Sequence, residues 1–89
     1  MKIDGSVLRR LRLYYGLRQI DLSYVLHVDP SLISHFERGV FEPSIRQARQ
    51  IAYLFDTNLF VLCGEEPLPD IIRNSHIPNR IRFTDHPEL

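Results

Sequence analysis

The chain has one cysteine and no long apolar run, and each shortage excludes a class of protein. Cys63 has no second cysteine to pair with, so no disulfide can form within the chain, and we expect a reducing, cytoplasmic location. No run approaches the roughly 18 apolar residues of a membrane span, and the first residues lack the apolar stretch of a signal peptide. The sequence therefore predicts a protein without disulfides and without a membrane partner.

The formal net charge of the chain is zero, although nucleic-acid-binding chains are usually basic. The chain carries 11 basic and 11 acidic residues. Residues 1–64 hold eight of the basic and six of the acidic residues, a balance of +2, and residues 65–89 hold three and five, a balance of −2. This asymmetry is mild, so charge alone does not indicate DNA as a partner.

Patterns that support catalysis or metal binding are absent as well. Four histidines and one cysteine are present, but no two stand at a helical ligand spacing and there is no C-x-x-C motif. The sequence also lacks a glycine-rich phosphate loop and a glycine-flanked nucleophile turn. We therefore expect no metal, no cofactor and no enzymatic activity.

What the sequence does contain is helical periodicity, set by apolar residues such as Leu8 and Leu11. Capping and stopping residues separate the periodic segments, most clearly Asp29-Pro30 before one segment and Gly39 after it. We expect the second helix to bury Leu22, Val25 and Leu26, and the fourth to bury a face that begins at Ile45. The five expected helices span residues 4–15, 19–26, 30–38, 45–55 and 59–63.

From residue 65 onward the pattern changes. Four prolines interrupt this segment, and its only helical period is about one turn near residues 70–73. Residues 80–84 alternate like a strand, with Ile81 and Phe83 on one side. The predicted fold is therefore all-α, a five-helix domain at residues 1–64 with a C-terminal extension at 65–89 that contains a candidate short strand.

Several residues stand in an order that is typical of one family. Gln19 opens the second expected helix, and the third contains Ile33-x-x-x-Glu37-x-Gly39. With these residues the sequence resembles the phage-repressor (Xre/Cro) helix-turn-helix family without a gap over about residues 5–64. The alternative is a generic helical bundle with helices of these lengths, because short motifs also arise by chance. The resemblance implies that the third helix enters the major groove of double-stranded DNA.

His27 stands in the turn between the second and third helices, where the family usually has glycine. Two helices that cross steeply over so short a turn need one residue with positive φ. Histidine adopts that conformation more readily than most residues. We therefore expect His27 to be a turn residue without a chemical role.

The resemblance also implies roles for individual residues. Arg12 and Glu37 correspond to positions that form a buried or half-buried ion pair between the first and third helices. Gln19 corresponds to a residue that holds a DNA phosphate, at a helix start where backbone N–H groups favour anions. The expected base-reading residues are Ser31, Leu32, Ser34 and His35. The expected phosphate contacts are Gln19, Arg9, Arg12, Arg18, Pro30, Arg38 and Arg46.

Two departures from the family pattern concern the DNA-binding face. No Arg, Gln or Asn in the third helix precedes Arg38, so no bidentate base contact is expected and DNA shape gains importance. The following loop has Val40, Phe41 and Glu42, where the family often has basic or amide residues. Glu42 would repel phosphate, and the two apolar residues indicate an apolar contact.

Residues 59–63 are apolar without interruption. We expect Leu59 and Leu62 to be buried in the domain core, which leaves the rest of this segment as an exposed apolar cluster. A second copy of the chain would cover it, together with strands from the two C-terminal extensions paired across a two-fold axis. The expected dimer interface is Phe60, Val61, Cys63, Ile81 and Phe83.

These observations support two functions of different classes. The first is a DNA-binding transcriptional regulator, most often a repressor in this family, bound to a pseudo-palindromic operator as a homodimer. The second is a protein-interaction module on the same fold, such as an antitoxin or an accessory factor of a phage or mobile element. The neutral charge and the apolar loop favour the second, whereas Gln19 and the frame of the third helix favour the first.

Overall fold

The computed structural model describes residues 1–75. The regular secondary structure of these residues is helical throughout, with turns and loops between the helices. The fold is all-α, as predicted, and the five expected helices are present. A sixth helix is the single turn expected near residue 70, whereas the candidate strand at 80–84 lies outside the described residues. The helices are α1 (Gly5–Tyr14), α2 (Gln19–Leu26), α3 (Pro30–Arg38), α4 (Ile45–Leu54), α5 (Leu59–Leu62) and α6 (Asp70–Arg73).

Four of the helices begin at a residue whose side chain accepts a hydrogen bond from a backbone N–H of the first turn. These caps are Asp4 for α1, Asp29 for α3, Ser44 for α4 and Asn58 for α5. Helix α2 uses the reverse arrangement, because the Asp21 carboxylate inside the helix accepts from the backbone N–H of Arg18 at 2.8 Å. Local sequence therefore fixes where these helices start.

The turn between α2 and α3 depends on His27. This residue has φ 57° and ψ 46°, the left-handed conformation, which confirms the expectation from the sequence. Its backbone N–H reaches back to the carbonyl of Tyr24, and that of Val28 to the carbonyl of Ser23. The chain is thereby reversed within a few residues, and Asp29 can cap α3 immediately afterwards.

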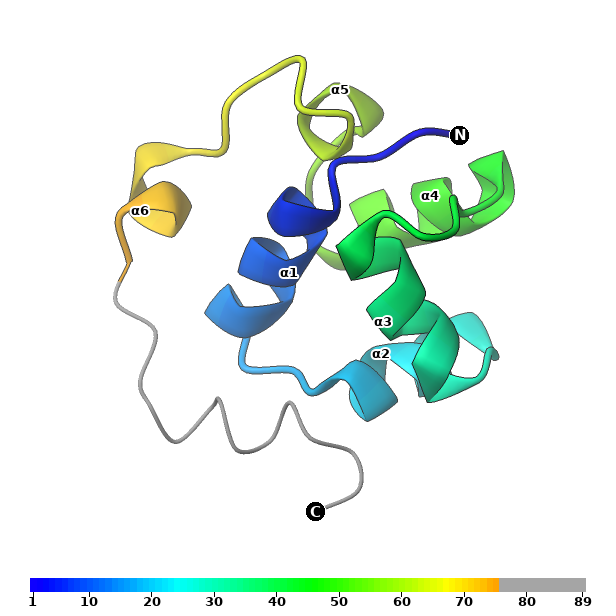
Figure 1. Cartoon of the computed structure of the whole chain (residues 1–89). Helices are drawn as coiled ribbons and strands as arrows, with labels where there is room; N and C mark the ends of the chain where they lie inside the picture. The colour runs from blue at the N-terminus through cyan, green and yellow to red at the C-terminus, as the bar shows by residue number, and fades with distance from the viewer. Residues whose placement is uncertain (76–89) are drawn as a thin grey trace.

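The helices pack around one core in which α1 is central (Figure 1). Helix α3 lies against α1 and α2, α4 lies beside α2 and α5, and α6 rests on the opposite flank of α1. The core includes a fully buried residue from each of the first five helices. These are Leu8 and Leu11 in α1, Leu22 in α2, Ile33 in α3, Ile51 in α4 and Leu62 in α5.

Two residues that we expected in the core are exposed. Val25 is 45% exposed, because α2 buries the arc formed by Leu22, Ser23 and Leu26, and Val25 lies outside that arc. Ile45 is 57% exposed, because it is the first residue of α4 and the buried face begins one turn later at Ala48. Both corrections leave apolar side chains on the same side of the molecule.

Helix α1 approaches the end of α3 very closely at Gly5. A Cβ atom on this residue would lie 2.2 Å from the carbonyl oxygen of Glu37, so no side chain fits there. The preceding residue, Asp4, donates its backbone N–H to the carbonyl of Leu62 at 2.7 Å. The start of α1 is thus fixed against two other helices.

The C-terminal extension is attached to the domain as far as Ser75. Ile72 is buried and belongs to the common core. The Arg10 side chain donates to the backbone carbonyls of Ile72 and Arg73, each at 3.1 Å, at the end of α6. Within residues 1–75 no helix is long and apolar enough to cross a membrane.

Candidate nucleic-acid interface

The first turn of α3 is held by Asp29. Its carboxylate accepts from the backbone N–H of Ser31 at 2.9 Å and from the Ser31 hydroxyl at 2.7 Å. These hydrogen bonds, the backbone one first, lower the pKa of Asp29 below its ordinary value. Because the hydroxyl proton of Ser31 is directed to Asp29, its oxygen offers lone pairs outward. Ser31 is thus arranged to accept from a base amino group.

The four expected base-reading residues all lie on the accessible side of α3. Ser31 is exposed, and Leu32, Ser34 and His35 are half-exposed. Leu32 also packs against the core, so only part of its side chain is available. Between them, Ile33 and Phe36 are buried and fix the rotation of the helix. The structure therefore presents these four side chains on one surface, and their contacts with bases remain a prediction.

The loop after α3 adds an aromatic residue to this surface. The ring of Phe41 meets the ring of His35 edge-on, with centroids 5.1 Å apart. The backbone N–H of Val40 donates to the carbonyl of His35 at 2.9 Å and folds the loop back on the helix. Phe41 remains 53% exposed. From the sequence we expected Val40 and Phe41 to make an apolar contact, but not that Phe41 would pack on a base-reading residue; an aromatic residue just after the stop at Gly39 was the available signal.

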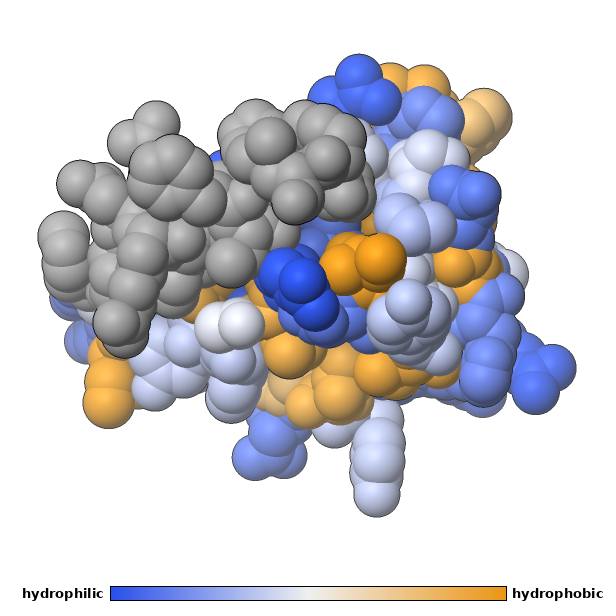
Figure 2. Space-filling view, turned by 90° about the horizontal axis from the view of Figure 1, so that it is seen from below, coloured by the Kyte–Doolittle hydropathy of each residue, from blue (hydrophilic) through white to orange (hydrophobic). Residues whose placement is uncertain are grey.

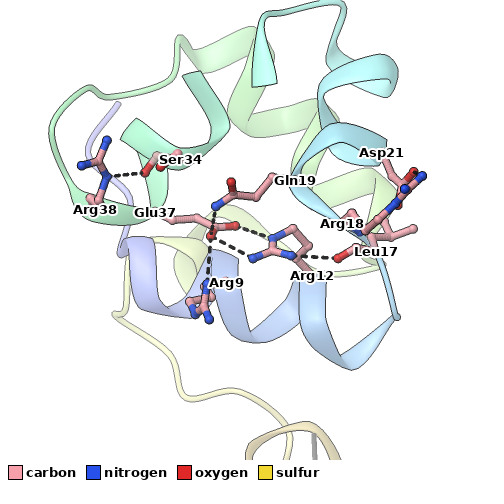
Figure 3. Close-up of polar contacts among 9 residues, drawn as sticks. All are labelled: Arg9, Arg12, Leu17, Arg18, Gln19, Asp21, Ser34, Glu37 and Arg38. Carbon is pink, nitrogen blue, oxygen red and sulfur yellow. Dashed lines mark hydrogen bonds and ion pairs between the residues drawn. The ribbon is translucent and has the colours of Figure 1, made fainter. Parts of the chain in front are cut away.

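Behind this surface lies an ion-pair network centred on Glu37 (Figure 3). Arg12 Nε donates to Glu37 Oε2 at 2.6 Å and Arg12 Nη2 to Oε1 at 3.1 Å, a bidentate pair between α1 and α3. Arg12 Nη1 donates to the carbonyl of Leu17 at 2.8 Å. The predicted ion pair is therefore present. The predicted phosphate contact of Arg12 is wrong, because this residue is fully buried and cannot reach DNA.

The same carboxylate orients two residues at the surface. Gln19 Nε2 donates to Glu37 Oε1 at 3.2 Å, and Arg9 Nη1 lies 3.7 Å from that oxygen (Figure 3). The Gln19 amide has a second N–H, and Arg9 keeps a side chain that is 47% exposed. Glu37 thus holds Gln19 at the start of α2 in the place where the family contacts phosphate.

The other arginines that we expected to contact phosphate differ in how strongly they are bonded within the chain. Arg18 is bonded through two nitrogens to the Asp21 carboxylate, at 3.0 and 3.1 Å, and this pairing lowers the pKa of Asp21. Arg38 is exposed and makes a long hydrogen bond of 3.4 Å to the carbonyl of Ser34. Arg46 is exposed on the first turn of α4. In Figure 3, Arg18 and Arg38 lie on opposite sides of the Glu37 network.

The expected dimer residues fall into three groups. Phe60 is 58% exposed, as predicted, and Cys63, which we expected in the same exposed cluster, is half-buried. The expectation that Val61 faces outward is wrong, because α5 directs both Val61 and Leu62 into the core. Ile81 and Phe83 lie outside the described residues. Among residues 1–75 no cluster of acidic, histidine and cysteine side chains is suited to hold a metal ion.

Figure 2 shows the molecule from below relative to Figure 1, and the surface on this side mixes apolar and hydrophilic groups. A short turn that joins α2 to α3, with the outer face of α3 accessible, defines a helix-turn-helix DNA-binding domain. The family model described as helix-turn-helix matches residues 8–62, more than half of the chain. The chain belongs to this Xre/Cro-like family of DNA-binding transcriptional regulators. No curated protein and no solved structure matches the chain.

Proposed function

We propose that the protein is a transcriptional repressor that binds a pseudo-palindromic operator as a homodimer. The observation that carries this proposal is the Glu37 network. One carboxylate fixes the start of α2, through Gln19, and the orientation of α3 relative to α1, through Arg12. Such a rigid frame supports recognition, because base contacts require the reading helix to be held in a fixed register on the phosphate backbone.

In the proposed complex the first turns of α3 enter the major groove. Ser31 accepts from an adenine or cytosine amino group, and His35, supported by Phe41, contacts a neighbouring base edge. Gln19 and Arg9 hold phosphates on one side of the groove, and Arg38 and Arg46 hold phosphates as well. With so few direct contacts, the local width and bendability of the operator contribute to specificity.

The homodimer is supported by Phe60, a large apolar side chain exposed on α5. A two-fold axis through this residue would bury it against its own copy and place two α3 helices on the same face of the duplex. Two half-sites about one helical turn apart would then be read together. The repressor role is the one most often found in this family, and occupancy of the operator alone would be sufficient for it.

Selection of bound sites from a random DNA pool tests the proposal. We expect an enriched consensus with two inverted half-sites centred about 10 base pairs apart, one helical turn of the duplex. A consensus with a single half-site would support DNA binding and contradict the dimer. A pool that stays random after repeated rounds, at a protein concentration where the fold is intact by circular dichroism, would contradict the DNA-binding function.

A further inference from the structure

A groove separates α2 from the outer face of α4, away from the outer face of α3. Its volume is about 680 Å³. Val25 of α2 contributes to one wall, and Ile45, Arg49 and Tyr53 of α4, spaced four residues apart, line the other. The groove is open to solvent, since Tyr53 is 90% exposed and Ile45 57% exposed. Apolar side chains that a helix leaves uncovered in this way mark a contact surface.

The groove also carries uncompensated positive charge. Arg46 and Arg49 line it, and neither makes an ion pair with a carboxylate of the described chain. No acidic side chain lines the groove. In contrast, Arg12, Arg18 and Arg73 each approach a carboxylate within the described chain. The chemistry that complements this surface is therefore apolar and acidic at once.

The shape of the groove indicates the conformation of its occupant. Ile45 and Tyr53 are eight residues apart, which corresponds to about 12 Å along α4. An amphipathic helix presents three or four apolar side chains over this length, with charged residues beside them. Binding of an extended peptide by strand addition needs an exposed strand edge, and residues 1–75 contain no strand.

We propose that the groove between α2 and α4 binds an acidic amphipathic helix of another protein. The leucine-like side chains of that helix would pack on Val25, Ile45 and Tyr53. Its carboxylates would pair with Arg49, which leaves Arg46 for its expected phosphate contact. None of the expected base-reading residues lines the groove, and Arg46 is the one lining residue among the expected phosphate contacts, so a partner held by Arg49 can bind while α3 reads DNA. The chain would thereby recruit a second protein to its operator.

The test uses the full-length chain and a fluorescein-labelled helical peptide of about 14 residues, with leucines at i, i+4 and i+7 and glutamates beside them. A matched peptide has lysine in place of each glutamate. We expect the anisotropy of the acidic peptide to saturate at a protein concentration at least tenfold lower than that of the lysine peptide, a difference of about 1.4 kcal/mol.

Substitutions in the groove assign the site. Arg49→Glu should weaken binding of the acidic peptide about tenfold and strengthen binding of the lysine peptide, because the sign of the pairing is reversed. Tyr53→Ala should weaken binding of both peptides. Both residues are exposed, so circular dichroism should show an unchanged fold. Gln19→Ala, a change in the DNA interface, serves as the control and should leave peptide affinity unchanged.

Four results would overturn the proposal. The first is equal affinity for the two peptides, and the second is an Arg49→Glu variant that binds as the native chain does. The third is displacement of the peptide by random-sequence duplex DNA, which would make the groove part of the phosphate-binding surface. The fourth is self-association that Tyr53→Ala abolishes, which would make a second copy the occupant.

Discussion

At the scale of single residues, two carboxylates organise the candidate DNA interface. Glu37 takes hydrogen bonds from Arg12 and Gln19, and Asp29 takes two from Ser31. Each directs a neighbour, so that Gln19 keeps one amide N–H and Ser31 keeps its oxygen lone pairs for a ligand. Acidic residues, which repel phosphate, here set the geometry of two groups that we expect to contact DNA.

Substitutions at Gln19 and Ser31 should separate affinity from specificity. Gln19→Ala should weaken binding to all duplexes about equally, because it removes a phosphate contact. Ser31→Ala should cost about 1–3 kcal/mol at one base position and relax the preference there. Titration against the selected operator and single-base variants measures both. Equal losses at every position in the Ser31 variant would remove this residue from base reading.

The cap at Asp29 should make stability depend on pH. Its pKa is lowered in the folded chain by hydrogen bonds from Ser31, so the stabilisation is complete above the unfolded pKa of about 3.9. It is lost as the pH falls through the lower, folded pKa. Asp29→Asn keeps a capping oxygen that does not titrate, so its melting temperature should fall less over this range. Parallel acid profiles of the two chains would contradict the assignment.

At the scale of elements, the packing of α1 on α3 depends on a glycine, which has no side chain, as much as on side-chain contacts. Gly5 lets the start of α1 meet the last turn of α3, and the Arg12–Glu37 pair joins the same two helices further along. The two features fix the angle at which α3 projects its outer face. The Arg12–Glu37 pair was expected from the sequence, whereas the close approach of the helices at Gly5 was not.

Gly5→Ala should therefore separate these helices. The added Cβ would stand 2.2 Å from the Glu37 carbonyl oxygen, a backbone atom that cannot rotate away. We expect a loss of about 1–3 kcal/mol in the free energy of unfolding, the usual effect of overpacking. Chemical denaturation measures it. Ser6→Ala, on the exposed side of the same turn, is the control, and an equal effect of the two changes would contradict the close approach.

The local features of the fold were predictable from the sequence, whereas of the tertiary features only the Arg12–Glu37 pair was, through the family resemblance. Caps such as Asp29 and the left-handed turn at His27 depend on a few neighbouring residues, and the structure has them as expected. Val25 and Val61 were misplaced because which arc of a short helix is buried depends on the helices packed against it. The burial of Arg12 was only partly foreseen for the same reason.

At the scale of the whole molecule, two exposed apolar regions lie outside the reading face. One is the exposed side chain of Phe60 on α5, and the other is the groove lined by Val25, Ile45 and Tyr53. Their chemistry differs, because only the groove carries unpaired arginines. We assign the first to a second copy of the chain and the second to an acidic helix, so one protomer could form both assemblies at once.

Phe60→Glu should shift the dimer toward monomer. A carboxylate at this position would be buried opposite its own copy across the two-fold axis, where like charges repel. Sedimentation velocity at micromolar concentration should show the native chain as a dimer and the variant as a monomer, with a weaker affinity for the full operator. Tyr53→Ala, in the groove, is the control and should leave the dimer intact. A native chain that sediments as a monomer would contradict the two-fold arrangement.

The internal pairing of arginines has a consequence for the ions around the DNA. Five of the expected phosphate contacts are arginines, and each phosphate that a protein cation neutralises releases condensed counterions from the duplex. Arg12 is buried with Glu37, and Arg18 is held by Asp21, so these two displace few counterions. Arg9 also lies 3.7 Å from Glu37, but its side chain is 47% exposed, so we count it with the exposed Arg38 and Arg46. The logarithm of the association constant should fall with that of salt concentration with a slope of about −3 per protomer, rather than the value near −4.5 that five contacts would give. Operator binding by this protein would then persist at salt concentrations that release more basic repressors from DNA.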